Sequence, residues 1–158
     1  MKLSTKARYA VMALLDMLNE GKETPVSLVS IAERQFLPLP YLEQIFLKLR
    51  KNGIVQSTRG AQGGYVFARD PGEITLYDVV VSVDTAFKSK RCHNSSIGCQ
   101  PNGARCLTHN LWAKLDDAVE CFFKSLTLRH AIDRDVSNMI FLMKTELDHS
   151  DDKIKVAC

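Results

Sequence analysis

Apolar side chains recur at helical spacing along the N-terminal third of the chain and predict three helices. The first runs over Ser4–Asn19 with Ser4 as its N-cap, since serine satisfies free amide groups at a helix start. Its buried stripe consists of Ala7, Val11, Leu14, Leu15 and Leu18. A second helix is expected to follow Ser27, and a third to span Tyr41–Lys51 with Pro40 in its first turn.

The hydrophobic period changes after the third helix and predicts two short strands. The first strand lies within Ile54–Thr58 and the second within Tyr65–Phe67, with a glycine-rich stretch at residues 59–64 between them. Three helices followed by a hairpin are the element order of a winged helix-turn-helix. We therefore expect a mainly α fold with a small β-hairpin wing.

The chain beyond the hairpin predicts a fourth helix and then a long loop. Thr75 and Asp78 resemble a capping box, which would open a helix ending near Asp84. Residues 85–106 are rich in Ser, Asn, Gly and Lys and show no apolar period, so we expect a loop. A loop of this length usually serves a function.

A broad apolar stripe predicts one long helix over Leu107–Leu126. The stripe consists of Leu111, Leu115, Ala118, Val119, Phe122 and Leu126, and is widened by Trp112 and Phe123. Such a stripe suits a dimer interface, and packing onto the helix's own domain would explain it equally well. Residues 136–147 remain apolar enough to add a further helix.

The composition, 46% apolar and 25% charged residues, is that of a soluble globular protein. The net charge of +3 is uneven, with ten Lys and Arg against six Asp and Glu in residues 1–70 and eleven against twelve in residues 71–158. A basic N-terminal half agrees with a polyanionic partner, although solvated surface charge explains it as readily. The apolar stretch Tyr9–Leu18 is interrupted by Asp16 and fits neither a signal peptide nor a membrane span. We therefore expect a cytoplasmic protein with no membrane partner.

Three of the five cysteines lie in or at the end of the expected loop, in the pattern Cys92-x6-Cys99-x6-Cys106-x2-His109. Thiolates with one imidazole can hold Zn²⁺ or an iron–sulfur cluster, and the spacing alone does not decide between them. Unligated structural cysteines are a third interpretation. Cys106 and His109 are three residues apart at a helix start and can point the same way, whereas His93, beside Cys92, is an alternative ligand.

Five segments together resemble one family of bacterial regulators. They are the N-terminal MKLSTKARYAV, Tyr41-Leu42-Glu43-Gln44, Leu49-Arg50-Lys51-Asn52-Gly53, Arg59-Gly60 followed by Gly63-Gly64-Tyr65, and Cys106-Leu107-Thr108-His109 followed by Leu111-Trp112. The combination covers about residues 1–130 and is similar to the iron–sulfur cluster regulator (IscR-like) family of winged-helix transcription factors. The six-residue gaps between the cysteines are longer than is usual in that family, and Pro38 and Pro40 stand where it has serines.

The resemblance implies a homodimeric repressor that carries a [2Fe–2S] cluster on Cys92, Cys99, Cys106 and His109. It further implies that the protein senses cluster supply, controls the genes for cluster assembly and can receive its cluster from the assembly machinery. Zinc or a [4Fe–4S] cluster on the same ligands is the alternative. On this basis we expect a DNA-binding domain at residues 1–84, a cluster-binding loop at 85–106, dimerisation and C-terminal helices at 107–147, and a disordered tail at 148–158.

The third helix is expected to lie in the major groove of DNA, where Tyr41, Glu43 and Gln44 reach base edges. Gln44 can pair with adenine and Glu43 can accept a hydrogen bond from cytosine, so Glu43 disfavours sites that offer it no donor. The resemblance implies that Glu43 also takes part in a switch between two classes of DNA site. Arg59 at the hairpin tip suits a narrow minor groove. The other expected contacts are the phosphate contacts of Lys6, Arg8, Lys48, Arg50 and Lys51, and the wing glycines Gly60, Gly63 and Gly64.

Several alternatives stay open at the level of sequence. Any one of these lysines can be a solvated surface charge, and Tyr41 can instead pack on its own helix. Other functions that fit are a related sensor of nitric oxide or iron, a cluster-free regulator of cysteine metabolism, and an iron–sulfur electron-transfer protein. The chain shows no supported Ser/His/Asp arrangement and no phosphate-binding loop, so we do not expect an enzyme.

Overall fold

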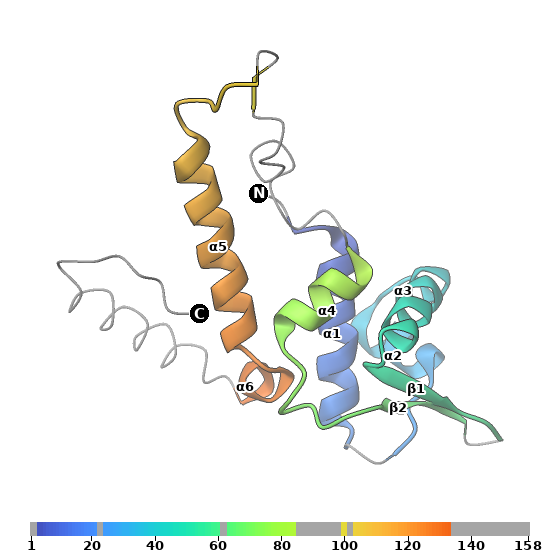
Figure 1. Ribbon diagram of the computed structural model, residues 1–158. Helices are drawn as coiled ribbons and strands as arrows, with labels where there is room; N and C mark the ends of the chain where they lie inside the picture. The colour runs from blue at the N-terminus through green and yellow to red at the C-terminus, as the bar shows by residue number, and fades with distance from the viewer. Residues whose placement is uncertain (1–2, 22–23, 61–62, 85–98, 101–102, 134–158) are drawn as a thin grey trace.

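The computed structural model describes residues 3–21, 24–60, 63–84, 99–100 and 103–133 (Figure 1). Helices make up most of this part of the chain, and one antiparallel hairpin completes it. In chain order the elements are α1 (Thr5–Asn19), α2 (Leu28–Gln35), α3 (Leu39–Lys51), β1 (Val55–Thr58), β2 (Gly64–Phe67), α4 (Leu76–Val83), α5 (His109–Ser125) and α6 (Leu128–Ile132). The expected helix over residues 136–147 and the tail at 148–158 lie outside the described residues.

Side-chain caps fix the starts of three helices where the sequence predicts them. The Ser4 hydroxyl accepts a hydrogen bond from the Ala7 amide at 3.2 Å, and the Ser27 hydroxyl accepts one from the Ser30 amide at 3.0 Å. Thr75 forms a full capping box, because the Asp78 carboxylate also accepts from the Thr75 amide at 3.2 Å. Each cap satisfies amide groups that have no partner inside the helix.

Helix α3 begins at Leu39, two residues before the start predicted from the sequence. Pro38 occupies the N-cap position without a side-chain cap bond, and Pro40 lies in the first turn. Proline is compatible with that turn because its missing amide would have had no partner there. The helix is joined to α2 through Phe36, whose φ of 53° is left-handed and lets the Leu37 amide bond the Ala32 carbonyl at 2.9 Å.

A charged network ties α1 to α2. Asp16 on α1 is buried, and its carboxylate accepts hydrogen bonds from Arg34 Nε at 3.1 Å and from Gln35 Nε2 at 2.7 Å. The hydrogen bonds to Asp16 raise the pKa of Arg34, so folding favours the charged guanidinium. That contribution to stability is present at neutral pH and would be lost only when the pH rises through the raised, strongly alkaline pKa.

One hydrophobic core joins the N-terminal helices to the last helix described. Its fully buried side chains include Leu14 of α1, Phe46 of α3 and Val79 of α4. Leu128 of α6 is also 0% exposed and belongs to the same core. Backbone hydrogen bonds from the Leu76 amide to Leu126 and from Leu128 to Ile74 fasten α6 beside the start of α4, at 2.7 and 3.0 Å.

Helix α5 extends away from the winged-helix part of the molecule, on the side opposite the hairpin (Figure 1). It begins at His109, two residues after the predicted start, and Leu107 before it is fully exposed. Towards its C-terminal end, Val119 and Phe123 pack against the core. The same helix is therefore anchored at one end and displays its other end to solvent.

Candidate nucleic-acid interface and cysteine site

Helix α3 presents a polar outer face over a buried inner one. Leu42, Ile45, Phe46 and Leu49 are buried, which turns the alternate positions outward. The exposed polar side chains are Glu43, Gln44, Lys48, Arg50 and Lys51, all five of which were predicted to contact DNA, and Leu47 is exposed among them. Their shared exposure is the geometry that a major-groove helix requires.

The hairpin is held against α3 by aromatic packing. Strands β1 and β2 pair antiparallel with Thr58 opposite Gly64 at the end of the ladder. Tyr65 packs edge-on against Phe46 with ring centroids 4.9 Å apart, and its backbone also bridges to Val26. This packing fixes the direction in which the hairpin projects from the helix, and it leaves Arg59 exposed beyond the end of β1.

The backbone geometry of the hairpin requires glycine at the wing positions. Gly60 has a φ of 122°, a conformation that side-chain-bearing residues rarely adopt. A Cβ on Gly64 would lie 2.6 Å from the Val26 carbonyl oxygen, and one on Gly63 would lie 2.7 Å from that of Thr58. These glycines therefore shape the hairpin whether or not DNA is bound, in addition to the DNA contacts predicted for them from the sequence.

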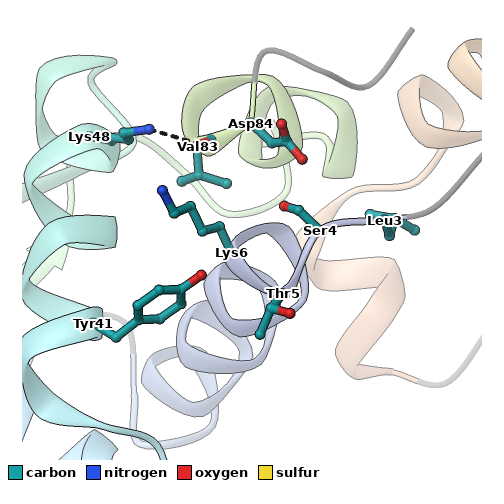
Figure 2. Close-up of a pocket in the computed structure, with 8 residues that line it drawn as sticks. All are labelled: Leu3, Ser4, Thr5, Lys6, Tyr41, Lys48, Val83 and Asp84. Carbon is teal, nitrogen blue, oxygen red and sulfur yellow. Dashed lines mark hydrogen bonds between the residues drawn. The ribbon is translucent and has the colours of Figure 1, made fainter. Parts of the chain in front are cut away.

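Tyr41 packs on α1. Its ring makes an edge-on contact with Tyr9 at 5.6 Å between centroids, and the side chain is half-buried. Tyr41 also lines an open pocket of about 630 Å³ between the start of α1, the middle of α3 and the end of α4 (Figure 2). Its phenol ring is therefore fixed by a neighbouring helix before any ligand arrives.

Two of the predicted phosphate-binding lysines, Lys6 and Lys48, meet in this pocket (Figure 2). Lys6 is half-buried at the start of α1, whereas Arg8 on the same helix is exposed. Lys48 Nζ donates a hydrogen bond to the backbone carbonyl of Val83 at 3.0 Å. Sequence reasoning missed this contact, because no local pattern links residues that are 35 positions apart.

The described part of the cysteine pattern brings one thiol to the start of α5. Cys99 Sγ lies 2.9 Å from His109 Nδ1, and His109 is buried as the first residue of the helix. A tight turn makes this possible, since the amides of Cys99 and Gln100 both bond the carbonyl of Ala104 at 3.0 and 3.1 Å. The thiol and the imidazole are therefore within hydrogen-bond distance of one another, which brings two of the predicted ligands together at the start of α5.

Cys106 belongs to the same region but contacts a different side chain. Its Sγ lies 3.7 Å from Thr108 Oγ1, which accepts a hydrogen bond from Trp112 Nε1 at 3.0 Å. In the described ranges, no three His, Cys, Asp or Glu side chains are grouped closely enough to hold a metal ion. Cys92 lies outside those ranges. Thiols and one imidazole nevertheless match the donor chemistry of an iron–sulfur or zinc centre.

The exposed half of α5 carries an apolar face. Leu111, Trp112 and Leu115 are 61%, 44% and 42% exposed. The spacing of these residues places them on one side of the helix. Large apolar side chains grouped in this way are typical of surfaces that another protein covers.

None of the described helices is both long enough and apolar enough to cross a membrane.

Comparison with known sequences gives consistent matches along most of the chain. Residues 3–134 match the model of the Rrf2 family, described as an iron-dependent transcriptional regulator. The chain is 46% identical to the HTH-type transcriptional regulator IscR of Photorhabdus laumondii, over 84% of this chain and 79% of that relative. It is 41% identical to IscR of Citrobacter koseri over 96% of this chain and 90% of the relative.

Solved structures give the same picture of the fold. The chain is similar to T. potens IscR with a TM-score of 0.69 and 38% identity, covering 85% of this chain and 88% of that structure. It is also similar to CymR, the global cysteine regulator of B. subtilis, with a TM-score of 0.71 and 32% identity over 85% of this chain and 98% of that one. The predicted winged-helix fold class and the resemblance noted in the sequence are both confirmed, and these relatives are transcriptional regulators, not enzymes.

Proposed function

The chain belongs to the Rrf2 family of transcriptional regulators, as an IscR-type member, and from this premise we propose that it senses iron–sulfur cluster status through a [2Fe–2S] cluster. In this proposal it controls genes for cluster assembly and acts from the cytoplasm as a DNA-bound homodimer. The observation that carries the sensory part is the 2.9 Å approach of Cys99 Sγ to His109 Nδ1.

Cys92, Cys99, Cys106 and His109 would hold the cluster. Thiolates suit iron bridged by sulfide, and a single imidazole in place of one thiolate is compatible with a [2Fe–2S] centre. When bound, the cluster supplies an exchangeable, redox-active group whose presence reports the supply of clusters. Occupancy is then readable by the protein, because all four ligands lie between the winged helix and α5 in the sequence or at the first residue of α5.

The chain's own residues position this site on α5. The His109 amide donates to the Cys106 carbonyl at 3.0 Å, which fixes the backbone between the two ligands at the helix start. Thr108 links the Cys106 thiol to the indole of Trp112, and Trp112 belongs to the exposed apolar face. A conformational change in the ligand segment would therefore reach the end of α5 that carries the exposed apolar face.

The DNA surface in this proposal is the outer face of α3 with the wing beside it. Glu43 and Gln44 would face base edges in the major groove, and Arg59 would enter the adjacent minor groove. Lys6, Arg8, Arg50 and Lys51 would contact phosphates and make binding salt-dependent. Helix-turn-helix dimers bind two half-sites related by symmetry, so pairing through α5 would set the spacing of the operator halves.

Anaerobic purification followed by visible spectroscopy and by iron, sulfide and zinc analysis tests the cofactor. We expect a red-brown protein with equal amounts of iron and sulfide. We expect Cys92→Ser, Cys99→Ser and Cys106→Ser to lose most of the visible absorption, since each removes a ligand. His109→Ala should also lose it, and His93→Ala is the matched control that should retain it.

Other outcomes would replace the assignment. A colourless protein with stoichiometric zinc would contradict the cluster and leave a zinc-bound or cluster-free regulator. Absorption that depends on His93 and not on His109 would show that His93 is the fourth ligand in place of His109. A visible spectrum and an iron content typical of four irons per site would show that the cluster is [4Fe–4S] and not [2Fe–2S].

A further inference from the structure

Lys48 reaches from α3, the helix proposed to contact base edges (the reading helix), to the end of α4. Its ammonium group donates a hydrogen bond to the backbone carbonyl of Val83, the last residue of α4, at 3.0 Å (Figure 2). Val83 is only 2% exposed, so its backbone lies at the edge of the core. The bond therefore joins two helices and is more than a local cap within one of them.

The end of α4 needs a cation that its own sequence does not provide. The carbonyl groups in the last turn of a helix have no partner within it, and they carry partial negative charge. The last turn of α4 contains no basic residue, and the acidic Asp84 follows it as the C-cap. Lys48, supplied by another helix, places its positive charge at this end.

The position of Lys48 gives this bond a consequence for DNA recognition. Lys48 lies one helical turn after Gln44 on α3, so both side chains share one side of the helix. On the other side of the bond, the chain leaves α4 at Asp84 and reaches Cys92 eight residues later. The Lys48–Val83 bond (the joint) therefore ties α3 to the helix end that directly precedes the cysteine segment in the sequence.

We propose that Lys48 is a positioning residue that fastens α3 to the end of α4 and couples the cysteine segment to the reading face. This assignment replaces its expected role as a phosphate contact. The coupling part rests on the proposed cluster-sensing function, whereas the joint itself does not. Displacement of the α4 end would shift α3 through the Lys48–Val83 bond and alter how Gln44 meets the bases.

Salt dependence separates the two roles of the lysine. A residue that neutralises one phosphate contributes about 0.9 to the slope of log Kobs against log salt concentration. We expect cluster-free Lys48→Met to bind DNA more weakly with an unchanged slope, and Lys48→Arg to restore affinity because arginine can also donate to the carbonyl. Lys51→Met, at the exposed end of the same helix, is the matched control whose slope should fall by about 0.9 for each protomer bound. A similar fall in Lys48→Met would overturn the proposal.

Amide exchange tests the joint without DNA. The Asp84 amide bonds the Val80 carbonyl at 2.9 Å and reports on the last turn of α4. Loss of a cation at a helix C-terminus should speed its exchange roughly two- to fivefold in Lys48→Met, with no change in Lys51→Met. Unchanged exchange in Lys48→Met would show that the bond does not hold this turn, and would also overturn the proposal.

The coupling is measured as the ratio of DNA affinities of cluster-loaded and cluster-free protein. We expect this ratio to move towards one in Lys48→Met and to keep its wild-type value in Lys51→Met. A wild-type ratio retained in Lys48→Met would overturn the coupling, even if exchange had changed. A ratio of one in the wild-type protein would instead overturn the sensory function, while the exchange result would still judge the joint.

Discussion

Phe36 is the one non-glycine residue with a left-handed backbone among those described, and its side chain is 93% exposed. The left-handed conformation costs a side-chain-bearing residue about 1–2 kcal/mol, and an exposed ring recovers little of this by packing. The turn between α2 and α3 thus retains strain at a single residue. Phe36 lies two positions before the N-cap of α3, the helix proposed to contact base edges.

We expect Phe36→Gly to stabilise the protein by up to about 1 kcal/mol, since the relief of strain exceeds the extra chain entropy of glycine. Thermal unfolding would show this as a midpoint higher by roughly 2–4 °C. Phe36→Ala is the control, because it removes the ring and keeps the strained backbone. Equal midpoints for the glycine and alanine variants would contradict the argument.

Glu43 is the only acidic side chain on the exposed face of α3. A carboxylate there repels phosphates and is tolerated where a base offers it a hydrogen-bond donor. We expect Glu43→Ala to reduce discrimination roughly tenfold between a selected duplex and a scrambled one, as measured by competition binding. Glu33→Ala on α2 is the control; equal discrimination in the two variants would remove Glu43 from site choice.

At the scale of elements, the features that depend on neighbouring residues, such as helix caps and the hairpin turn, were predicted correctly from the sequence. Ser4, Ser27 and Thr75 cap helices as their sequence contexts predict, and the glycine-rich stretch forms the end of a hairpin as expected. The start of α3 was predicted two residues late, because Pro38 can be an N-cap without donating or accepting through its side chain. Such a start has no side-chain signature in the sequence.

The side-chain contacts between different elements could not be predicted from the sequence. The bonds from Arg34 to Asp16 and from Lys48 to Val83 join residues 18 and 35 positions apart, and no periodicity relates them. Cys99 and His109 were predicted to be ligands of one site; the structure brings them within hydrogen-bond distance, and their ligand role stays a prediction. Their closeness depends on the turn at Ala104, which the spacing of the cysteines does not encode.

The exposed apolar face of α5 makes a prediction about assembly. If the chain forms the proposed homodimer through this face, we expect Leu115→Asp to convert it to monomer in sedimentation, because a carboxylate in a covered apolar face would lose its hydration. Val29→Asp is the matched control, since Val29 on α2 is 51% exposed and lies on another helix. A Leu115→Asp variant that stays dimeric would place the interface elsewhere.

At the scale of the whole molecule, the fold places the proposed DNA-binding face of α3 and the proposed cluster ligand at the start of α5 on one body. The core that holds α3 also contains Leu128 just beyond α5, so the two parts are connected through packing as well as through the chain. A regulator built in this way can register occupancy of its cysteine site as a change in DNA affinity. Coupling between two sites of one protein usually amounts to a factor of about 5–150.

The most direct test is anaerobic DNA binding by cluster-loaded and cluster-free protein at one fixed salt concentration. Duplexes selected from a random pool by each form would be titrated with both forms. We predict that the two forms select different duplexes, and that each binds its own set about tenfold or more tighter than the other form does. Equal affinity of both forms for every duplex would contradict the proposal that this protein senses clusters.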